Sequence, residues 1–318
     1  MDAQDMQILC ALAFATGGGG TPAARTPSLN NLARRIRLDT KTVRNRIRRL
    51  EESGFIKYYQ STPHPGLLGA PFTATVRFEA MNIVTKLAAL VQARQEPGVL
   101  DIVDYLGPTF SVSSAVASAE ESERLSARIA RRFELAQVIV SMGTSPPPEQ
   151  TPTSLDWRIL GRLRYDAHAS WEAIAAELRI TPRMVRYRVR QLLNSGAIVI
   201  RPVLDPTVLH VPVLYQLTAT IDPGMGGEVV HRLRRSLGDR TWSVHAPADG
   251  PVRFELFGFS LADPEADLVR VLHDPAVHSV SSLITKQHLE PDRPSWVDRE
   301  ISARAEIGRS PKQTVRRS

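Results

Sequence analysis

The sequence contains a single cysteine, Cys10, among its 318 residues. One cysteine cannot form a disulfide within the chain, which excludes a disulfide-stapled secreted fold and favours a reducing compartment. No uninterrupted apolar run approaches the roughly 18 residues that a membrane-spanning helix requires. The first residues, Met1-Asp2-Ala3-Gln4-Asp5, are acidic, whereas a secretory signal begins with basic residues. We therefore expect a cytoplasmic protein that has no membrane partner.

Motifs of several enzyme classes are also missing. The sequence has no Gly-x-Ser-x-Gly elbow, no Gly-Lys-Ser/Thr phosphate loop and no His-x-x-x-His pair. His273 and His278 are five residues apart without further ligands nearby, so we interpret them as turn residues rather than a metal site. The sequence therefore predicts no catalytic residues, no metal and no cofactor, and the protein is not expected to be an enzyme.

The composition suits a folded protein with an anionic partner. The hydrophobic fraction is 42%, which is enough to form packed cores. The formal net charge is +7, which favours binding to an anionic surface, although charge alone does not distinguish nucleic acid from a membrane.

An internal repeat organises the chain. Residues 38–56 align without a gap with residues 180–198, at a constant offset of 142 residues. Upstream, Asp5-x-x-Ile8-Leu9 matches Asp156-x-x-Ile159-Leu160 at an offset of 151, so the first copy carries an insertion. The insertion falls at Gly17–Pro22, which we interpret as a flexible loop. The matched pairs of the third helices are Val43/Val185, Arg44/Arg186, Arg46/Arg188, Ile47/Val189, Arg48/Arg190, Leu50/Leu192, Ser53/Ser195 and Gly54/Gly196.

Each copy opens with three predicted helices and a short β-hairpin, which is the order of a winged helix-turn-helix. Asp39 and Thr181 are expected N-caps of the third helices, Pro182 suits a first helical position, and Gly54 and Gly196 suit the helix stop. The helices are expected at residues 2–15, 28–36 and 40–53 in the first copy, and at 155–166, 170–178 and 182–195 in the second.

The third helix of each copy separates apolar from basic side chains. At 100° per residue, Val43, Ile47 and Leu50 form one stripe, and Val185, Val189 and Leu192 form its equivalent. The opposite face is basic, and Arg, Lys and Asn can bind phosphates and base edges. The predicted DNA-binding residues are Lys41, Arg44, Asn45, Arg48, Arg49, Arg183, Arg186, Tyr187 and Arg190.

A strand-helix-strand-strand-helix-strand pattern follows each wing and predicts a ferredoxin-like βαββαβ domain. In the second copy, the segment Val252–Phe259 alternates apolar and charged residues, which is typical of a half-buried strand. The fold class is therefore α+β, with two tandem copies of a winged helix-turn-helix followed by a ferredoxin-like sensor domain.

The predicted boundaries follow the repeat. Four prolines between residues 145 and 154 indicate an extended linker between the copies. The domains are expected at 1–65 (winged helix-turn-helix), 66–144 (sensor), 145–154 (linker), 155–206 (winged helix-turn-helix), 207–290 (sensor) and 291–318 (a basic, disordered tail).

The sequence resembles the Lrp/AsnC, or feast/famine, transcriptional regulators. The resemblance rests on the two Asp-x-x-Ile-Leu segments, the two Arg-rich third helices that end in Ser-Gly-x-Ile, Pro65-x-Leu67-x-Gly69, and Asp205-Pro206-x-x-Leu209. It implies sequence-specific binding of double-stranded DNA, assembly through the sensor domains and control by a small-molecule effector. Only a glycine of the family's turn pattern is recognisable, at Gly107 and Gly250, so the effector-binding residues stay unassigned.

Two other functions remain open at this point. Siroheme decarboxylases have a similar architecture, and their chemistry relies on His and Tyr near the sensor cavity. A non-specific architectural DNA binder also fits the basic helices. As a regulator, the fused chain is expected to form an internal pseudodimer that associates further into a homo-oligomer.

Overall fold

A computed structural model describes residues 1–15, 29–144, 148, 150–208, 213–247 and 250–307. The loop predicted at Gly17–Pro22 lies outside the described residues, as does most of the segment 145–149. The predicted α+β class and the tandem arrangement are confirmed. Within the described residues, no helix combines the length and the apolar character needed to cross a bilayer.

The helix-turn-helix units form where their caps predict. The first unit consists of α1 (Ala3–Ala15), α2 (Leu29–Ile36) and α3 (Thr40–Glu52), and the second of α6 (Ser154–Leu163), α7 (Trp171–Leu178) and α8 (Pro182–Asn194). The Asp39 side chain accepts a hydrogen bond from the Thr42 amide, and Thr181 does the same for Met184. Gly54 and Gly196 have φ angles of 78° and 72°, which residues with a side chain rarely adopt. Both helix stops therefore depend on glycine.

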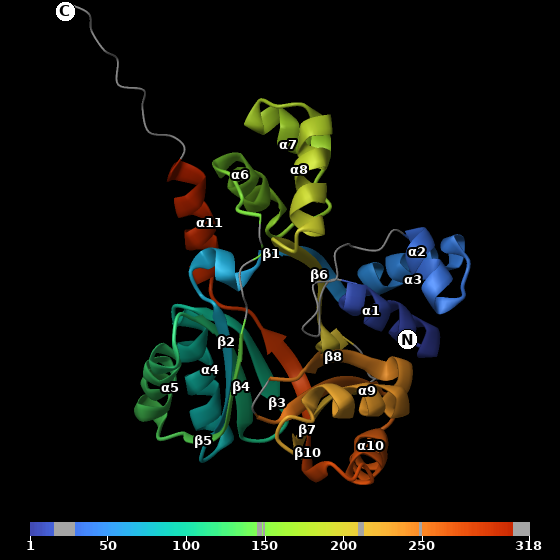
Figure 1. Cartoon of the computed structure of the whole chain (residues 1–318), viewed down its shortest axis with the longest axis vertical. Helices are drawn as coiled ribbons and strands as arrows, with labels where there is room; N and C mark the ends of the chain where they lie inside the picture. The colour runs from blue at the N-terminus through green and yellow to red at the C-terminus, as the bar shows by residue number, and fades with distance from the viewer. Residues whose placement is uncertain (16–28, 145–147, 149, 209–212, 248–249, 308–318) are drawn as a thin grey trace, which may run out of the picture.

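The wing differs from the expected hairpin. The strand that follows each recognition helix, β1 (Ile56–Pro63) or β6 (Ile198–Leu204), has no strand partner in its own copy within the described residues. Instead, β1 and β6 pair antiparallel with each other, with Gln60 opposite Arg201. A two-stranded sheet therefore joins the two copies, and it lies below α6–α8 and beside α1–α3 in the view of Figure 1.

The two sensor domains together form an eight-stranded sheet in the order β5-β2-β4-β3-β10-β7-β9-β8. Each half has the predicted βαββαβ order. The first contains β2 (Phe72–Glu79), α4 (Ile83–Gln95), β3 (Val99–Tyr105), β4 (Thr109–Val116), α5 (Ala119–Phe133) and β5 (Ala136–Thr144). The second contains β7 (Val213–Ile221), α9 (Gly226–Leu237), β8 (Thr241–His245), β9 (Val252–Gly258), α10 (Asp263–Leu272) and β10 (Val277–Leu289).

The long strand β10 connects the two halves. Its residues from Val277 to Ile284 pair with β7 of its own copy, and its residues from Thr285 to Leu289 pair with β3 of the first copy. The halves also face each other, because the Arg77 guanidinium of β2 donates to Gln216 and Thr218 of β7 at 2.7 Å each. The helices α4 and α5 cover the outer face of the first half, and α9 and α10 cover that of the second (Figure 1).

The alternation of residues in β9 predicts a strand with one face in solvent, and this prediction is wrong. Phe254 and Leu256 face α9 and α10, as expected, but Arg253 on the other face is only 8% exposed. The face predicted to meet solvent meets the first sensor domain instead. A strand covered on both faces can still alternate when its second face is lined by polar groups.

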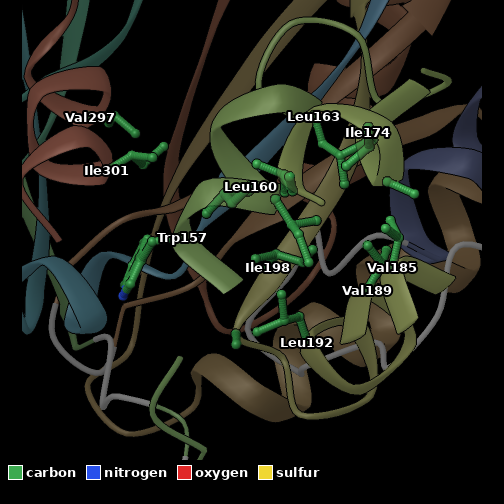
Figure 2. Packing of buried hydrophobic residues seen from close by; sticks show 14 of the residues in the cluster. Trp157, Leu160, Leu163, Ile174, Val185, Val189, Leu192, Ile198, Val297 and Ile301 are labelled. Carbon is green, nitrogen blue, oxygen red and sulfur yellow. The ribbon is translucent and has the colours of Figure 1, made fainter. Parts of the chain in front are cut away.

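The predicted disordered tail is also corrected. Residues Trp296–Glu306 form a helix, α11, that packs on α6. Figure 2 shows Val297 and Ile301 of α11 pointing toward the helix that carries Trp157 and Leu160. The sequence did carry a signal, because Ser295 and Asp298 form a capping box.

Polar contacts complete this attachment. The Asp298 carboxylate accepts hydrogen bonds from Arg164 at 3.0 Å and from the Tyr165 hydroxyl at 2.6 Å. The Arg304 guanidinium donates to the carbonyl of Leu67 at 3.2 Å. The helix α11 therefore ties the second helix-turn-helix unit to the segment that enters the first sensor domain.

We predict that Ile301→Ala loosens this attachment. Ile301 is 3% exposed, and truncation of a buried isoleucine costs about 2–5 kcal/mol. Urea unfolding followed by the intrinsic fluorescence of the four tryptophans, of which Trp157 and Trp296 lie at this contact, measures the loss. Ile307→Ala is the matched control, because Ile307 is 77% exposed and its loss should stay within about 0.5 kcal/mol. Equal stability of the two variants would contradict the packing role of α11.

Candidate nucleic-acid interface

The nine predicted DNA-binding side chains lie on the surface of α3 and α8. Lys41, Arg44, Asn45, Arg48 and Arg49 of α3 are exposed, and so are Arg183, Arg186, Tyr187 and Arg190 of α8. Tyr187 is 58% exposed, which is unusual for a large aromatic residue and leaves its ring free to contact a partner. Its hydroxyl accepts a hydrogen bond from Gln191 at 2.7 Å.

The opposite face of each recognition helix is buried. Val43 and Leu50 of α3 are at most 3% exposed, and Val185, Val189 and Leu192 of α8 share that limit. Ile47 is partly buried beside them. The helix α3 packs on α1, α2 and β1, whereas α8 packs on α6, α7 and β6. Each helix therefore presents its basic face outward while its apolar stripe holds it in place.

Two arginines of the repeat have a different role. Arg46 Nη1 lies 2.8 Å from Asp5 Oδ1, and Arg188 Nη1 lies 3.3 Å from Asp156 Oδ2. Asp5 is fully buried and Asp156 is 2% exposed. The hydrogen bond that Arg46 donates to the Asp5 carboxylate raises the pKa of Arg46, which secures its charge. The aspartate of each Asp-x-x-Ile-Leu segment thus ties the first helix of its unit to the recognition helix.

Arg49 is both exposed to solvent and paired with the buried Asp5. Its Nη2 atom lies 2.8 Å from Asp5 Oδ2, although 61% of its side chain is exposed. In the second copy, the residue at the Arg49 position is Gln191, which contacts Tyr187 instead. Among the described residues, α3 is therefore held by three ion pairs, which join Arg46 to Asp2 and Asp5 and Arg49 to Asp5, whereas α8 is held by one. The sequence predictions leave Arg46 and Arg188 out of the DNA-binding residues but include Arg49, because its partner Asp5 lies 44 residues earlier in the chain.

Comparison with known proteins finds a helix-turn-helix family in each copy. Residues 153–193 match the AsnC-type helix-turn-helix domain family, and residues 26–57 match a winged helix-turn-helix DNA-binding family. The second copy carries an AsnC-type helix-turn-helix domain. The resemblance to the Lrp/AsnC regulators is therefore confirmed in the second helix-turn-helix unit, where the AsnC-type domain includes the whole of α8 except Asn194.

Solved structures show where the complete fold recurs. The crystal structure of the siroheme decarboxylase NirDL superposes with a TM-score of 0.51 and 11% identity, over 96% of this chain and 100% of that one. Its complex with an iron-uroporphyrin III analogue gives a TM-score of 0.50 and 12% identity, with the same coverage of both chains. Escherichia coli AsnC matches 43% of this chain and 94% of its own, with 17% identity and a TM-score of 0.37. No protein of curated function matches the sequence.

We predict that Asp5→Asn destabilises the first helix-turn-helix unit. The change removes the charge that Arg46 and Arg49 share, and hydrogen bonds to charged groups contribute about 1.5–3 kcal/mol. Chemical denaturation of the variant measures the loss. Glu52→Gln is the control, because it removes one exposed acid from α3 itself. If Asp5→Asn is no less stable than this control, the aspartate does not hold the recognition helix.

Proposed function

We propose that this protein is a sequence-specific, DNA-binding transcriptional regulator of the Lrp/AsnC type and not an enzyme. The observation that carries the proposal is that α3 and α8 separate exposed basic residues from residues that hold the helix in place. Arg46, Arg188 and the apolar stripes contact the rest of each unit, whereas the other basic residues face outward. Exposed arginine and lysine can neutralise phosphates, and arginine and asparagine can read guanine and adenine edges.

The chain acts in this proposal as an internal pseudodimer. The pairing of β1 with β6 and of β3 with β10 supports it, because each joins one copy to the other. A regulator built in this way carries two recognition helices at a spacing set by one polypeptide. Asn45 on α3 and Tyr187 on α8 differ in chemistry, so we propose that the protein recognises two unequal half-sites.

Further self-association is part of the same proposal. The outer side of α4 exposes Val84 (78%), Leu87 (48%) and Val91 (58%), with Met81 (79%) just before the helix. These residues follow a helical spacing and form one apolar stripe, which a second copy of the chain would cover with its own α4 in a two-fold contact. The corresponding face of α9 carries Glu228, His231 and Arg235 instead.

Two triple variants test recognition. In one, Lys41, Asn45 and Arg48 are replaced by alanine; in the other, Arg183, Tyr187 and Arg190 are replaced. The fold should lose little, because exposed side chains usually contribute within about 0.5 kcal/mol each. Binding should weaken strongly, since each good bidentate base contact carries roughly 1–3 kcal/mol of discrimination. The measurement is footprinting on a site selected from random DNA, with thermal unfolding recorded alongside.

The pattern of loss separates the alternatives. Loss of a different half-site footprint in each variant is the expected result. Equal weakening on specific and unrelated DNA would favour a non-specific architectural binder. A footprint that survives both triple variants would refute α3 and α8 as the recognition helices.

A siroheme-processing enzyme is the second candidate, because the likeness to NirDL extends over nearly the whole of both chains. Tyr105 is buried and His245 is half-buried between the two sensor domains, which suits the His and Tyr requirement of that chemistry. We expect no turnover when siroheme is incubated with the purified protein and the products are separated by chromatography. Loss of carboxyl groups from siroheme would favour the enzyme over the regulator.

A further inference from the structure

The two helix-turn-helix units differ in the helix that precedes each recognition helix. This helix is α2 in the first unit and α7 in the second. Residues 29–36 of α2 and residues 171–178 of α7 align without a gap, at the same offset of 142 that relates the two recognition helices. The two helices can therefore be compared position by position.

The same positions of α2 and α7 are buried, and the same positions are exposed. The buried pair is Leu32 and Ala33 in α2 and Ile174 and Ala175 in α7, and all four are at most 3% exposed. The four exposed positions on the opposite side differ in charge. They carry Asn30, Asn31, Arg34 and Arg35 in α2, and Glu172, Ala173, Ala176 and Glu177 in α7.

The exposed face of α2 lies beside the start of its recognition helix. The Asn30 side chain accepts a hydrogen bond from the Thr40 hydroxyl at 3.0 Å, which joins the first turn of α2 to the first residue of α3. Asn30, Asn31, Arg34 and Thr40 line one surface hollow between the two helices. The polar face of α2 and the beginning of the basic face of α3 therefore form one continuous surface.

The acids of the first unit do not cancel this basic surface. Asp39 caps α3, because its carboxylate accepts hydrogen bonds from the Thr42 amide at 2.8 Å and from the Thr42 hydroxyl at 2.5 Å. Glu51 and Glu52 lie in the last turn of α3, whereas a recognition helix contacts base edges with its N-terminal residues. Residues 29–55 contain eight basic and three acidic residues, and the equivalent residues 171–197 contain five and two.

The exposed acids of α7 have the wrong charge for a DNA backbone. Glu177 forms an ion pair with Arg162 of α6, and about half of each side chain is exposed. In helix-turn-helix proteins, the helix before the recognition helix crosses the DNA backbone. A phosphate beside α2 would meet two arginines, whereas a phosphate beside α7 would meet two carboxylates.

We propose that the first helix-turn-helix unit anchors the protein to DNA through phosphate contacts of Arg34 and Arg35, and that the second unit binds its half-site only while the first is bound. This order of binding rests on the proposed function. Because β1 pairs with β6, the bound first unit holds the second close to the same DNA. The resulting high effective concentration offsets the weaker affinity of the second unit.

The first test compares the two half-sites. Duplexes that contain one half-site of the selected DNA are titrated with the full chain and followed by fluorescence anisotropy. The footprints of the two triple-alanine variants assign each half-site to its unit. The half-site of the first unit should bind at least about tenfold more tightly at low salt, because each added phosphate contact changes affinity roughly eightfold for a tenfold change in salt. Equal affinity of the two half-sites would overturn the proposal.

The second test removes the arginines of α2. The double variant Arg34→Gln, Arg35→Gln should weaken binding to specific and unrelated DNA alike, and should lower the log–log salt slope by about 1.8, since each phosphate contact contributes about 0.9. The control is Arg131→Gln, Arg132→Gln on α5, which removes the same charge from exposed positions of the first sensor domain. If both double variants change the slope equally, α2 does not contact phosphates.

The third test is a gain of binding, which loss of folding cannot imitate. Glu177→Arg gives α7 the residue that α2 has at the equivalent position, Arg35. Affinity for the half-site of the second unit should rise several-fold, and the salt slope should steepen by about 0.9. Loss of the exposed pair with Arg162 should cost little stability. Glu123→Arg on α5 is the matched control, and an equal gain in that variant would overturn the role of α7.

Failure of this inference and failure of the proposed function are distinguishable. A wild-type protein that binds no DNA at low salt refutes the regulator together with the anchor. Binding that is shared equally by the two half-sites, or is insensitive to the changes in α2, refutes the anchor and leaves the regulator. Equal binding to all duplexes refutes sequence-specific recognition and the order of binding, while the salt slope of the α2 variant still decides whether Arg34 and Arg35 contact phosphates.

Discussion

The pairing of strand edges between the two copies is the constraint on which the rest of the structure depends. An unpaired edge strand exposes a row of amide and carbonyl groups that attracts other chains. In this protein, β3 of the first sensor domain is covered by the second half of β10, and β1 and β6 cover each other. Neither β1 nor β6 has another partner among the described strands, so each copy completes the other.

This pairing explains why polar residues can line the space between the sheets. Face-to-face packing of two sheets usually depends on an apolar interface. Here, backbone hydrogen bonds from Thr285 to Leu289 hold one side of the contact, and the inner faces are free to carry Arg77, Gln216 and Arg253. The backbone attachment therefore allows the inner faces to be polar.

Sequence reasoning found the features that depend on local chemistry. Helix bounds were predicted to within about three residues, because caps such as Asp39 and stops such as Gly54 act over a single turn. The basic residues of α3 and α8 were placed correctly on the surface, because helical periodicity alone separates them from Val43 and Val185. The DNA contacts themselves stay a prediction.

The missed features all depend on distant segments. The pairing of β1 with β6 joins residues that are about 140 positions apart, and strand patterns do not specify a partner. Arg253 alternates with apolar neighbours as a solvent-facing residue would, and only the presence of the first domain makes it buried. The capping box at Ser295 and Asp298 is a local signal for a helix, but it does not specify that the helix packs on α6.

The two helix-turn-helix units are attached to the sheets in different ways, although their sequences repeat. The first rests on the second sensor domain through α1, where Met6 and Leu9 meet Leu214 and Phe257. The second is held by α11, and its Asp298 contacts Arg164 and Tyr165. The second unit has an apolar contact of the same kind, because Leu68 and Leu100 of the first copy pack in its core, and α11 adds a further attachment. Each helix-turn-helix unit therefore rests on residues of the other copy, so neither unit is positioned by its own sensor domain alone.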